Sequence, residues 1–378
     1  MLPLLQLPRI FFEFGVVSVL PAELASLGIS RPLFVTDNNL IGLDVYARVR
    51  RTVPPGVDVT VFSDVPENPT AAAAHQCLAL YHAQKCNGIV AIGGGSVIDC
   101  AKAAAFLVSH PGNLLDYLGR PDRITSPPAP LIAIPTTAGT GSEVSRGCGI
   151  HPDATSRAKG INHPLMVPKV AICDPELTLS LPAHLTAGTG MDALTHCVEG
   201  YLAKSINPLV DAVALDGVQR LATYIERVVQ NGQDRAARSE VMMAALQGGI
   251  SIYKGLGPAH AISNTCGDRG LHHGVLTTLA LPAVMRLLEP HARDKMLALC
   301  KAMGCVGSET AADAVEKLNN KLGLPKNIGA YGYGKVDLEE MTTDVSESFF
   351  NVPSPYRPTR DEYRSILEGL LGATSIPA

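Results

Sequence analysis

The sequence predicts an α/β domain with a parallel sheet over residues 1–180, followed by an all-α domain over residues 181–378. A chain of 378 residues is too long for one simple core, so two domains are expected. In the first half, short apolar runs alternate with helical stretches, which is typical of a parallel sheet with helices on both faces. After Leu181 the β-branched runs fade, and long Ala/Leu-rich stretches follow.

The strands and helices of the first domain are expected to alternate along the chain. The expected strands are apolar runs at residues 9–15, 31–37, 58–64, 88–95 and 131–135. The expected helices are residues 18–28, 44–53 and 70–86, and a fourth that begins near Ser96. This order of elements favours a parallel sheet, because each crossover between parallel strands needs a helix-length connection.

The second domain is expected to contain helices alone. Its helical stretches cover residues 183–203, 208–230, 234–253, 275–289, 291–303 and 308–322. Pro175 and Pro182 mark the change of pattern between the domains. From Asp337 onward, shorter helical pieces are interrupted by "NVPSPYRP".

Composition excludes several classes of function. The net charge is -4 without any basic run, so no nucleic-acid or polyanion partner is indicated. Aromatic residues make up 5% of the chain and Trp is absent, which argues against a stacking platform for bases or large sugars. The first residues lack a basic segment and a continuous apolar run, so neither a secretory signal nor a membrane span is expected.

The cysteines indicate a reducing compartment. There are nine, an odd number, and they are scattered without any C-x-x-C pair. This usage favours free thiols over a disulfide framework or a Cys-based zinc site. We therefore expect a soluble cytoplasmic protein.

Asp192 and His196, in "GTGMDALTHCVEGY", are the most informative pair in the chain. In a helix, a spacing of four residues stacks both side chains on one face, where a carboxylate and an imidazole can bind one divalent cation. Two further candidate ligands follow, His260 and either His273 or its neighbour His272. The alternative is that Asp192 caps a turn and the histidines are buried and hydrogen-bonded. The four residues together, set among many glycines, favour a metal site.

A glycine-rich turn follows one of the expected strands. In "AIGGGSVID", Gly93, Gly94 and Gly95 separate a strand from the start of a helix, and Ser96 can cap that helix. Glycines allow a ligand to approach the backbone, and the free N–H groups of a helix start attract phosphate. A tight strand-to-helix turn without a ligand is the alternative.

A second polar turn, "IPTTAGTGSEVS", places Thr136, Thr137 and Thr140 directly after a strand. Open α/β sheets bind ligands at the carboxyl ends of their strands. Asp37 ends another strand, where a carboxylate can accept hydrogen bonds from an adenosine ribose and repel a 2′-phosphate, which favours NAD over NADP. The alternatives are a structural cluster of hydroxyls and a turn begun by Asp37. Asn68 is a weaker candidate for the same cleft.

Five motifs together resemble the group III, iron-activated alcohol dehydrogenases: "AIGGGSVID", "IPTTAGTGSEV", "AICDPELTLSLP", "GMDALTHCVEGY" and "LHHG". The resemblance extends from residue 9 to about residue 284. It implies a nucleotide-binding α/β domain, a helical domain with the dehydroquinate synthase-like architecture, and hydride transfer between NAD(H) and a small primary alcohol or aldehyde. A metal would polarise the substrate oxygen as a Lewis acid.

The resemblance also assigns roles to individual residues. The metal ligands that it implies are Asp192, His196, His260 and His273. The cofactor contacts that it implies are Asp37, Asn68, Gly94, Gly95, Ser96, Asp99, Thr136, Thr137, Thr140 and Lys159. An Asp and three His suit Fe²⁺, although Zn²⁺ accepts the same ligands.

The chain departs from the family pattern around its third and fourth ligands. Family members usually carry a second histidine four residues after the third ligand, where this chain has Asn264, which cannot carry a proton near neutral pH. Solvent, a ribose hydroxyl or His272 could carry the proton instead. The "LHHG" doublet resembles members that act on 4-hydroxybutyrate, although those usually have a longer loop. Arg269 could pair with a substrate carboxylate or lie in solvent, and Ser251 stands where relatives often have an aromatic residue.

Two other functions fit the same elements. A lyase of the dehydroquinate synthase type also uses a metal and NAD, but its ligands are spaced differently. A binding protein that has lost activity is the other alternative, which Asn264 would explain. The edge strand near the N-terminus also predicts a homodimer or a higher oligomer.

Overall fold

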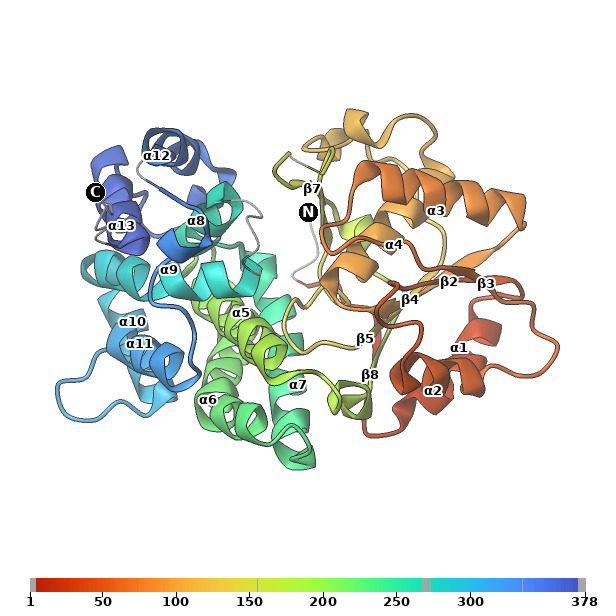
Figure 1. The fold of residues 1–378 in the computed structure, drawn as a ribbon, viewed down its shortest axis with the longest axis horizontal. Helices are drawn as coiled ribbons and strands as arrows, with labels where there is room; N and C mark the ends of the chain where they lie inside the picture. The colour runs from red at the N-terminus through yellow and green to blue at the C-terminus, as the bar shows by residue number, and fades with distance from the viewer. Residues whose placement is uncertain (1–4, 155, 267–270, 272, 335, 373–378) are drawn as a thin grey trace. The chain divides into compact units, whose positions relative to one another are not determined.

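The computed structural model describes residues 5–154, 156–266, 271, 273–334 and 336–372. The chain forms two compact units, Met1–Leu181 and Pro182–Ala378, which we call the N-terminal and the C-terminal unit. The N-terminal unit is α/β and the C-terminal unit is helical (Figure 1), so the predicted fold class is confirmed. No helix in the described ranges is long and apolar enough to cross a membrane.

A six-stranded parallel sheet forms the centre of the N-terminal unit. Its strands lie in the order β1-β8-β5-β4-β2-β3, and every neighbouring pair is parallel. The strands are β1 (Arg9–Phe12), β2 (Pro32–Val35), β3 (Thr60–Phe62), β4 (Gly88–Gly93), β5 (Leu131–Pro135) and β8 (Val170–Cys173). The first five fall inside the runs predicted from the sequence, whereas β8 was not predicted as a strand.

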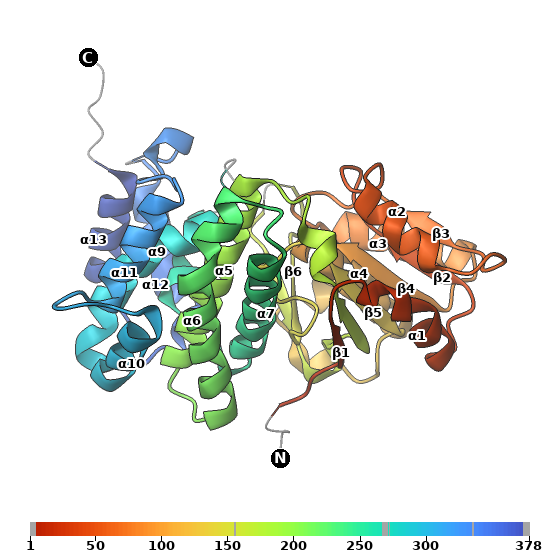
Figure 2. The same ribbon diagram turned by 90° about the horizontal axis from the view of Figure 1, so that it is seen from below.

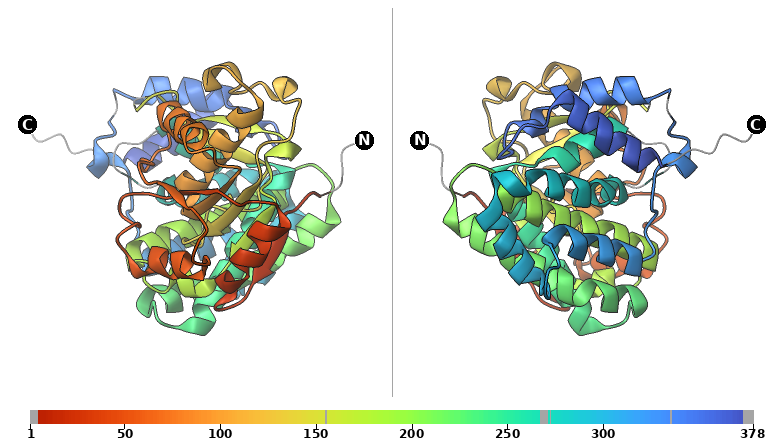
Figure 3. Two further views of the ribbon diagram at one scale, coloured as in Figure 1. Left: turned by 90° about the vertical axis from the view of Figure 1, so that its right-hand side faces the viewer. Right: turned by 90° about the vertical axis from the view of Figure 1, so that its left-hand side faces the viewer.

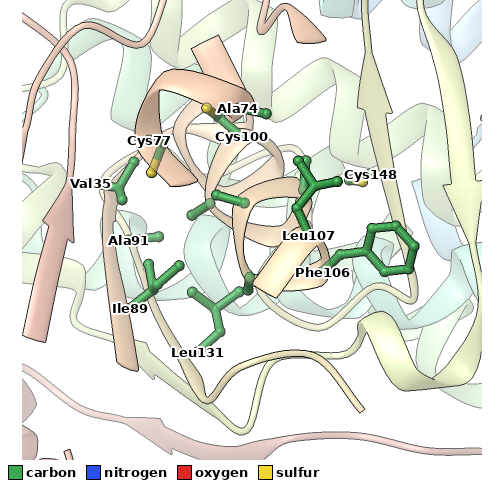
Figure 4. Close-up of a cluster of buried hydrophobic side chains, with 14 of the residues drawn as sticks. Val35, Ala74, Cys77, Ile89, Ala91, Cys100, Phe106, Leu107, Leu131 and Cys148 are labelled. Carbon is green, nitrogen blue, oxygen red and sulfur yellow. The ribbon is translucent and has the colours of Figure 1, made fainter. Parts of the chain in front are cut away.

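Helices cover both faces of this sheet (Figure 1). One face packs against α3 (Ala71–Ala83) and α4 (Gly95–Ser109), and the other against α1 (Leu20–Ser26) and α2 (Asp44–Thr52). Figure 4 shows the first of these two cores, which includes Val35 and Ile89 from the sheet and Phe106 and Leu107 from α4. Neighbouring strand residues point to opposite faces, so the strands are apolar throughout.

An antiparallel hairpin in the N-terminal unit was missed. It consists of β6 (Gly147–Ile150) and β7 (Lys159–Asn162), outside the main sheet. Its strands, "GCGI" and "KGIN", contain three glycines and little of the alternation that identifies a strand. A buried lysine of α4 holds it: Lys102 Nζ donates to the carbonyl oxygens of Ser145 and Gly147 at 3.0 and 2.7 Å.

The C-terminal unit consists of helices, green to blue in Figures 2 and 3, and contains no strand among its described residues. They are α5 (Ala183–Leu202), α6 (Pro208–Gln230), α7 (Arg235–Ser251), α8 (Pro258–Cys266), α9 (His273–Leu288), α10 (Arg293–Met303), α11 (Ala311–Lys321), α12 (Leu338–Glu347) and α13 (Arg360–Leu371). Helix α8 was not predicted. The unit is built around α5, which packs against α6, α7 and α9 and is buried almost all round.

Leucines 107 and 115 allow a matched test of the N-terminal core. Leu107 is 2% exposed and Leu115 is 44% exposed. We expect Leu107→Ala to lower the free energy of unfolding by about 2–5 kcal/mol, because it removes buried methyl groups and leaves a cavity. Urea denaturation followed by circular dichroism measures the loss. Leu115→Ala is the control, and an equal loss in both variants would contradict this description of the core.

Candidate metal centre and cofactor site

Helix α5 carries two of the predicted ligands on one buried face. Asp192 and His196 are 2% and 4% exposed, and His196 Nε2 lies 3.8 Å from Asp192 Oδ1. Their spacing of four residues is one helical turn, so both side chains point the same way from the helix axis. A buried carboxylate among imidazoles is a costly arrangement unless a cation or hydrogen bonds compensate the charge.

Helices α8 and α9 bring two more predicted ligands to this face of α5. Ligand atoms of Asp192, His260 and His273 all lie within 4.8 Å of one another. The His196 ring stacks on the His260 ring, with centroids 4.8 Å apart and planes inclined by 18°. His196 therefore lies directly beside this group of three, although it is not part of it. His272, the other candidate for the last ligand, lies outside the described residues.

Glu199 settles which nitrogen of His260 faces the group. Its carboxylate accepts a hydrogen bond from His260 Nδ1 at 2.6 Å, so Nδ1 carries a proton. His260 Nε2 is buried and has no hydrogen-bond partner among the described residues. A metal-bound histidine usually donates one ring N–H to a carboxylate and binds the metal through its other nitrogen, and His260 has the first of these contacts. The residues present therefore fit a divalent cation.

His273 is held in a similar way from α8. The Ser263 hydroxyl lies 3.2 Å from the His273 carbonyl oxygen and 3.0 Å from His273 Nδ1. The hydroxyl donates to the carbonyl oxygen, and the direction of its bond with Nδ1 depends on the tautomer of the ring.

Two glycines and a threonine let the helices approach α5 closely. A Cβ on Gly274 would lie 2.4 Å from the Gly188 carbonyl oxygen and 2.7 Å from Asp192 Cβ, so only glycine fits there. A Cβ on Gly248 of α7 would lie 3.0 Å from a carbonyl oxygen of α5 and 3.2 Å from His196 Cβ. Thr277 Oγ1 lies 3.1 Å from Asp192 Oδ1. Small residues at these positions place α9 and α7 directly against the ligand-bearing face.

Two of the residues at which this chain departs from the family pattern, Ser251 and Asn264, differ in how deeply they are buried. Ser251 is fully buried at the end of α7, donates to the Gln247 carbonyl oxygen at 2.7 Å and packs against Gly200 of α5. Its position is thus in the contact between two helices. Asn264 is half-buried on α8, one turn after His260. Arg269 lies outside the described residues.

The N-terminal unit places several of the predicted cofactor residues at the carboxyl ends of its strands. The chain passes from β2 to β3 on one side and then crosses to β4 on the other side of β2. Such a reversal opens a crevice at the carboxyl ends of the two strands, where α/β sheets bind nucleotides. Asp37 follows β2, and Gly94 and Gly95 follow β4, so both predicted elements lie at the edge where such a crevice is expected.

The glycine-rich turn after β4 packs against the polar turn after β5. A Cβ on Gly94 would lie 3.3 Å from Thr137 Cγ2, and one on Gly95 would lie 2.7 Å from Thr140 Cγ2. Thr136 donates its N–H to the Gly93 carbonyl oxygen at 3.0 Å, which joins the ends of β4 and β5. Helix α4 begins at Gly95, without any side-chain cap. Its first N–H groups are therefore available to an anion.

The other predicted cofactor residues differ in their hydrogen bonds and in their exposure to solvent. Asp37 Oδ1 accepts from the N–H groups of Asn39 and Leu40, both at 2.9 Å, so this carboxylate also holds a turn. Ser96 Oγ donates to the Glu67 carbonyl oxygen, next to the half-buried Asn68. The Lys159 side chain is exposed at the start of β7.

Asp99 is half-buried and belongs to a structural network. It accepts from the Ser142 hydroxyl and from the Gly149 N–H at 2.8 Å, and so ties α4 to the polar turn and to β6. Burial raises the pKa of Asp99 despite the neighbouring Lys102, and burial lowers the pKa of Lys102. Burial also raises the pKa of Glu143, in the same turn, to about 7. These contacts stabilise the turn that carries the threonines.

Comparison with known proteins identifies the chain. Residues 8–175 match the family model of iron-containing alcohol dehydrogenases, and residues 186–371 match the model of the C-terminal part of that family. The 4-hydroxybutyrate dehydrogenase of Cupriavidus necator is 40% identical over 96% of this chain and 98% of its own. The chain belongs to the iron-containing alcohol dehydrogenase family. It is accordingly a metal-dependent alcohol oxidoreductase.

Solved structures agree with this identification. A 1,3-propanediol oxidoreductase superposes with a TM-score of 0.91 at 30% identity, over 96% of this chain and 98% of its own. A sulfoacetaldehyde reductase from Bifidobacterium kashiwanohense, solved with NAD⁺, superposes with a TM-score of 0.90 at 25% identity, over 98% of each chain. Both similarities extend over the α/β and the helical unit of the dehydrogenase.

Sequence reasoning missed the residues that orient the candidate ligands. Glu199 follows His196 by three residues on the same helix, so its spacing could have been noticed, but a helical glutamate is usually solvent-exposed. Ser263 and Thr277 carry no recognisable signal, because hydroxyl residues are common in helices and turns. Their roles depend on which helices meet, which the sequence does not state.

The pKa of His260 predicts that metal binding weakens as the pH falls. Burial disfavours the charged ring, but Glu199 and Asp192 favour it, and together they raise the pKa of His260 above its ordinary value of 6.5. A proton competes with a metal ion for Nε2 at every pH below this raised pKa. We expect the increase in Tm on adding Fe²⁺ to be largest at alkaline pH and to shrink as the pH is lowered.

The metal-free protein should show the opposite trend at this site. With no ion bound, the protonated His260 ring beside Glu199 stabilises the fold, and that stabilisation is lost as the pH rises through the raised pKa. Anaerobic thermal melts over a series of pH values, with and without Fe²⁺, measure both trends. A metal-induced increase in Tm that does not change with pH would contradict this description of His260.

Proposed function

We propose that the enzyme is an NAD-dependent, Fe²⁺-activated dehydrogenase that interconverts 4-hydroxybutyrate and its aldehyde. The observation that carries the proposal is the 40% identity to a 4-hydroxybutyrate dehydrogenase over nearly the full length of both chains. A relative of this similarity is a stronger guide to the substrate than the fold, because one fold hosts many reactions.

The candidate metal centre supports this chemistry. Asp192, His196, His260 and His273 would hold the ion, which, when bound, polarises the substrate oxygen for hydride exchange with the nicotinamide. Glu199 and Ser263 hold the rings of His260 and His273 through their Nδ1 atoms. The buried position of Asp192 excludes water from its carboxylate and so strengthens its attraction for a cation.

The cofactor would bind at the carboxyl edge of the sheet in the N-terminal unit. Its contacts would be Asp37, Asn68, Gly94, Gly95, Ser96, Asp99, Thr136, Thr137, Thr140 and Lys159. The uncapped start of α4 and the two glycines before it suit a pyrophosphate. Asp99 is bonded to Ser142 and Gly149, so we expect it to act by holding the polar turn.

Asn264 limits the ways in which a proton can leave the substrate. Its amide donates and accepts hydrogen bonds but does not ionise near neutral pH. We propose that Asn264 orients a water molecule or the substrate through hydrogen bonds. A different group then transfers the proton to solvent. His272 remains the candidate for that group.

Asp37 gives a test of cofactor choice. We expect Asp37→Gly to raise the ratio of kcat/KM for NADPH to that for NADH at least about tenfold, which corresponds to 1.4 kcal/mol. The reason is that the carboxylate repels the 2′-phosphate of NADP. Asp37→Asn is the matched control for the turn, because its carbonyl oxygen can still accept from Asn39 and Leu40. An unchanged ratio in both variants would show that Asp37 does not face the ribose.

Substrate identity is tested by NADH consumption with a panel of short aldehydes. The panel contains succinic semialdehyde, butanal and 3-hydroxypropanal, and the enzyme is loaded anaerobically with Fe²⁺, loaded with Zn²⁺, or treated with a chelator. We expect the highest kcat/KM for succinic semialdehyde, with turnover lost on chelation. Equal kcat/KM for butanal would show that the carboxylate is not recognised.

His260→Ala is the variant that tests the metal site in the same assay. We expect lower metal content, loss of turnover and an intact helical circular dichroism spectrum, because the remaining ligands leave one coordination position open. Full turnover by a metal-stripped His260→Ala protein would end the proposal. Turnover of no aldehyde by the metal-loaded wild-type enzyme would favour the lyase or a binding protein that has lost activity.

We also propose a homodimer or higher oligomer in the cytoplasm. Strand β1 is at the edge of the sheet, where it pairs only with β8 among the described strands, and an open edge favours pairing with another chain. All nine cysteines are free thiols and seven are buried, as expected in a reducing compartment. Light scattering that gives the mass of a single chain would exclude the oligomer.

A further inference from the structure

Glu199 is a buried carboxylate that the proposed ligand set does not use. It follows Asp192 by seven residues and His196 by three on α5, so all three side chains lie along one face of the helix. It is 3% exposed. A buried carboxylate in a helical bundle requires hydrogen bonds or a cation, because its desolvation is costly.

The donors that Glu199 accepts from all belong to the start of α8. Its Oε1 accepts from the Ala259 N–H at 2.6 Å, and its Oε2 accepts from the Gly257 N–H at 2.8 Å. The same Oε2 accepts from His260 Nδ1 at 2.6 Å. One carboxylate thus satisfies two N–H groups at the beginning of the helix and the side chain of a candidate ligand.

No space separates the carboxylate from this segment. A Cβ on Gly257 would lie 2.8 Å from Glu199 Oε1 and 3.0 Å from Glu199 Cδ. The absence of a side chain at residue 257 therefore allows the backbone of α8 to reach α5 at this point. The contact fixes the position of His260 relative to Asp192 and His196, which α5 itself carries.

The carboxylate also determines the tautomer of His260. An ionised carboxylate can only accept, so the nitrogen that it faces must carry a proton. The opposite nitrogen, Nε2, then presents its lone pair toward Asp192 and His273, the other members of the candidate metal group. Glu199 therefore controls both where the His260 ring lies and which of its nitrogens can bind an ion.

We propose that Glu199 is a positioning residue for the metal: it clamps α8 to α5 and holds His260 as the tautomer that binds the ion through Nε2. This inference rests on the ligand set of the proposed function. It assigns Glu199 no contact with the metal or the substrate. A glutamate that only capped α8 would affect the stability of the fold and leave metal affinity unchanged.

The substitution Glu199→Gln separates these two roles. The amide oxygen can still accept from one of the two backbone N–H groups, so part of the cap is kept. With its oxygen in the place of Oε1, the amide keeps the bond from the Ala259 N–H, and its nitrogen takes the place of Oε2. That nitrogen is a donor, so His260 Nδ1 becomes the acceptor and the proton moves to Nε2. The opposite orientation keeps the proton on Nδ1, so nitrogen-15 spectra of the variant are needed to tell the two apart. We expect the affinity for Fe²⁺ to fall about 10–100-fold, the usual effect of losing a carboxylate behind a metal-bound histidine.

The experiment measures metal affinity without substrate or NAD. Metal-free full-length wild type, Glu199→Gln and Thr310→Ala are titrated with Fe²⁺ under anaerobic conditions against a chromophoric chelator, and the Tm of each metal-free protein is recorded. Thr310 caps α11 through the Asp313 N–H and touches none of the candidate ligands, so it is the matched loss of a helix cap. Wild-type affinity in Thr310→Ala and weakened affinity in Glu199→Gln are the expected results.

Wild-type affinity in Glu199→Gln, with a lowered Tm and with nitrogen-15 spectra that place the His260 proton on Nε2, would overturn the proposal and leave Glu199 as a cap. If Glu199→Gln does not fold, or keeps the proton of His260 on Nδ1, the Zn²⁺-loaded wild-type protein provides the second measurement. Nitrogen-15 spectra of its histidine side chains, with His260 assigned by its loss in His260→Ala, should show a proton on Nδ1 of His260. A proton on Nε2 would overturn the proposal. Metal binding by a wild-type enzyme that reduces no aldehyde would defeat the proposed substrate alone.

Discussion

The C-terminal unit depends on how α5 compensates the polar groups that it buries. Asp192, His196 and Glu199 are each less than 5% exposed on one face of a helix that other helices surround. An uncompensated charge in such a place would cost more than a small domain can supply. The compensation comes from α8 and α9, through backbone N–H groups, imidazoles and the hydroxyl of Thr277. The requirements of folding and those of ion binding are therefore met by the same contacts.

In the N-terminal unit the corresponding constraint is the geometry of a parallel sheet. Because all six strands run the same way, their carboxyl ends share one edge. The turns that follow the strands must therefore pack closely against one another. Gly94 and Gly95 have no side chains, so the polar turn that carries the threonines can lie directly against them. Asp99 and Lys102, both on α4, hold the polar turn and the β6–β7 hairpin through hydrogen bonds.

Much of this arrangement was predictable, for physical reasons that differ between elements. The parallel strands are apolar throughout because both faces of the sheet are covered, so β1 to β5 were recognisable. Asp192 and His196 were recognisable because helical spacing alone brings them together. His260 and His273 were candidates because they border a glycine-rich stretch downstream, and the family resemblance chose His273 over His272, since residues far apart in the chain carry no spacing signal. Helix α8 is short and begins after two glycines, and β6 and β7 are rich in glycine, so neither shows a clear period.

The distribution of the proposed sites along the chain has a consequence for how the enzyme is made. Every proposed cofactor contact lies before residue 182, and every proposed metal ligand lies after it. Domains fold as units during synthesis, the N-terminal one first. The nucleotide-binding surface can therefore be complete on the ribosome while the ion's ligands are still untranslated. The proposed ligands of the ion, by contrast, all belong to the unit that is translated last.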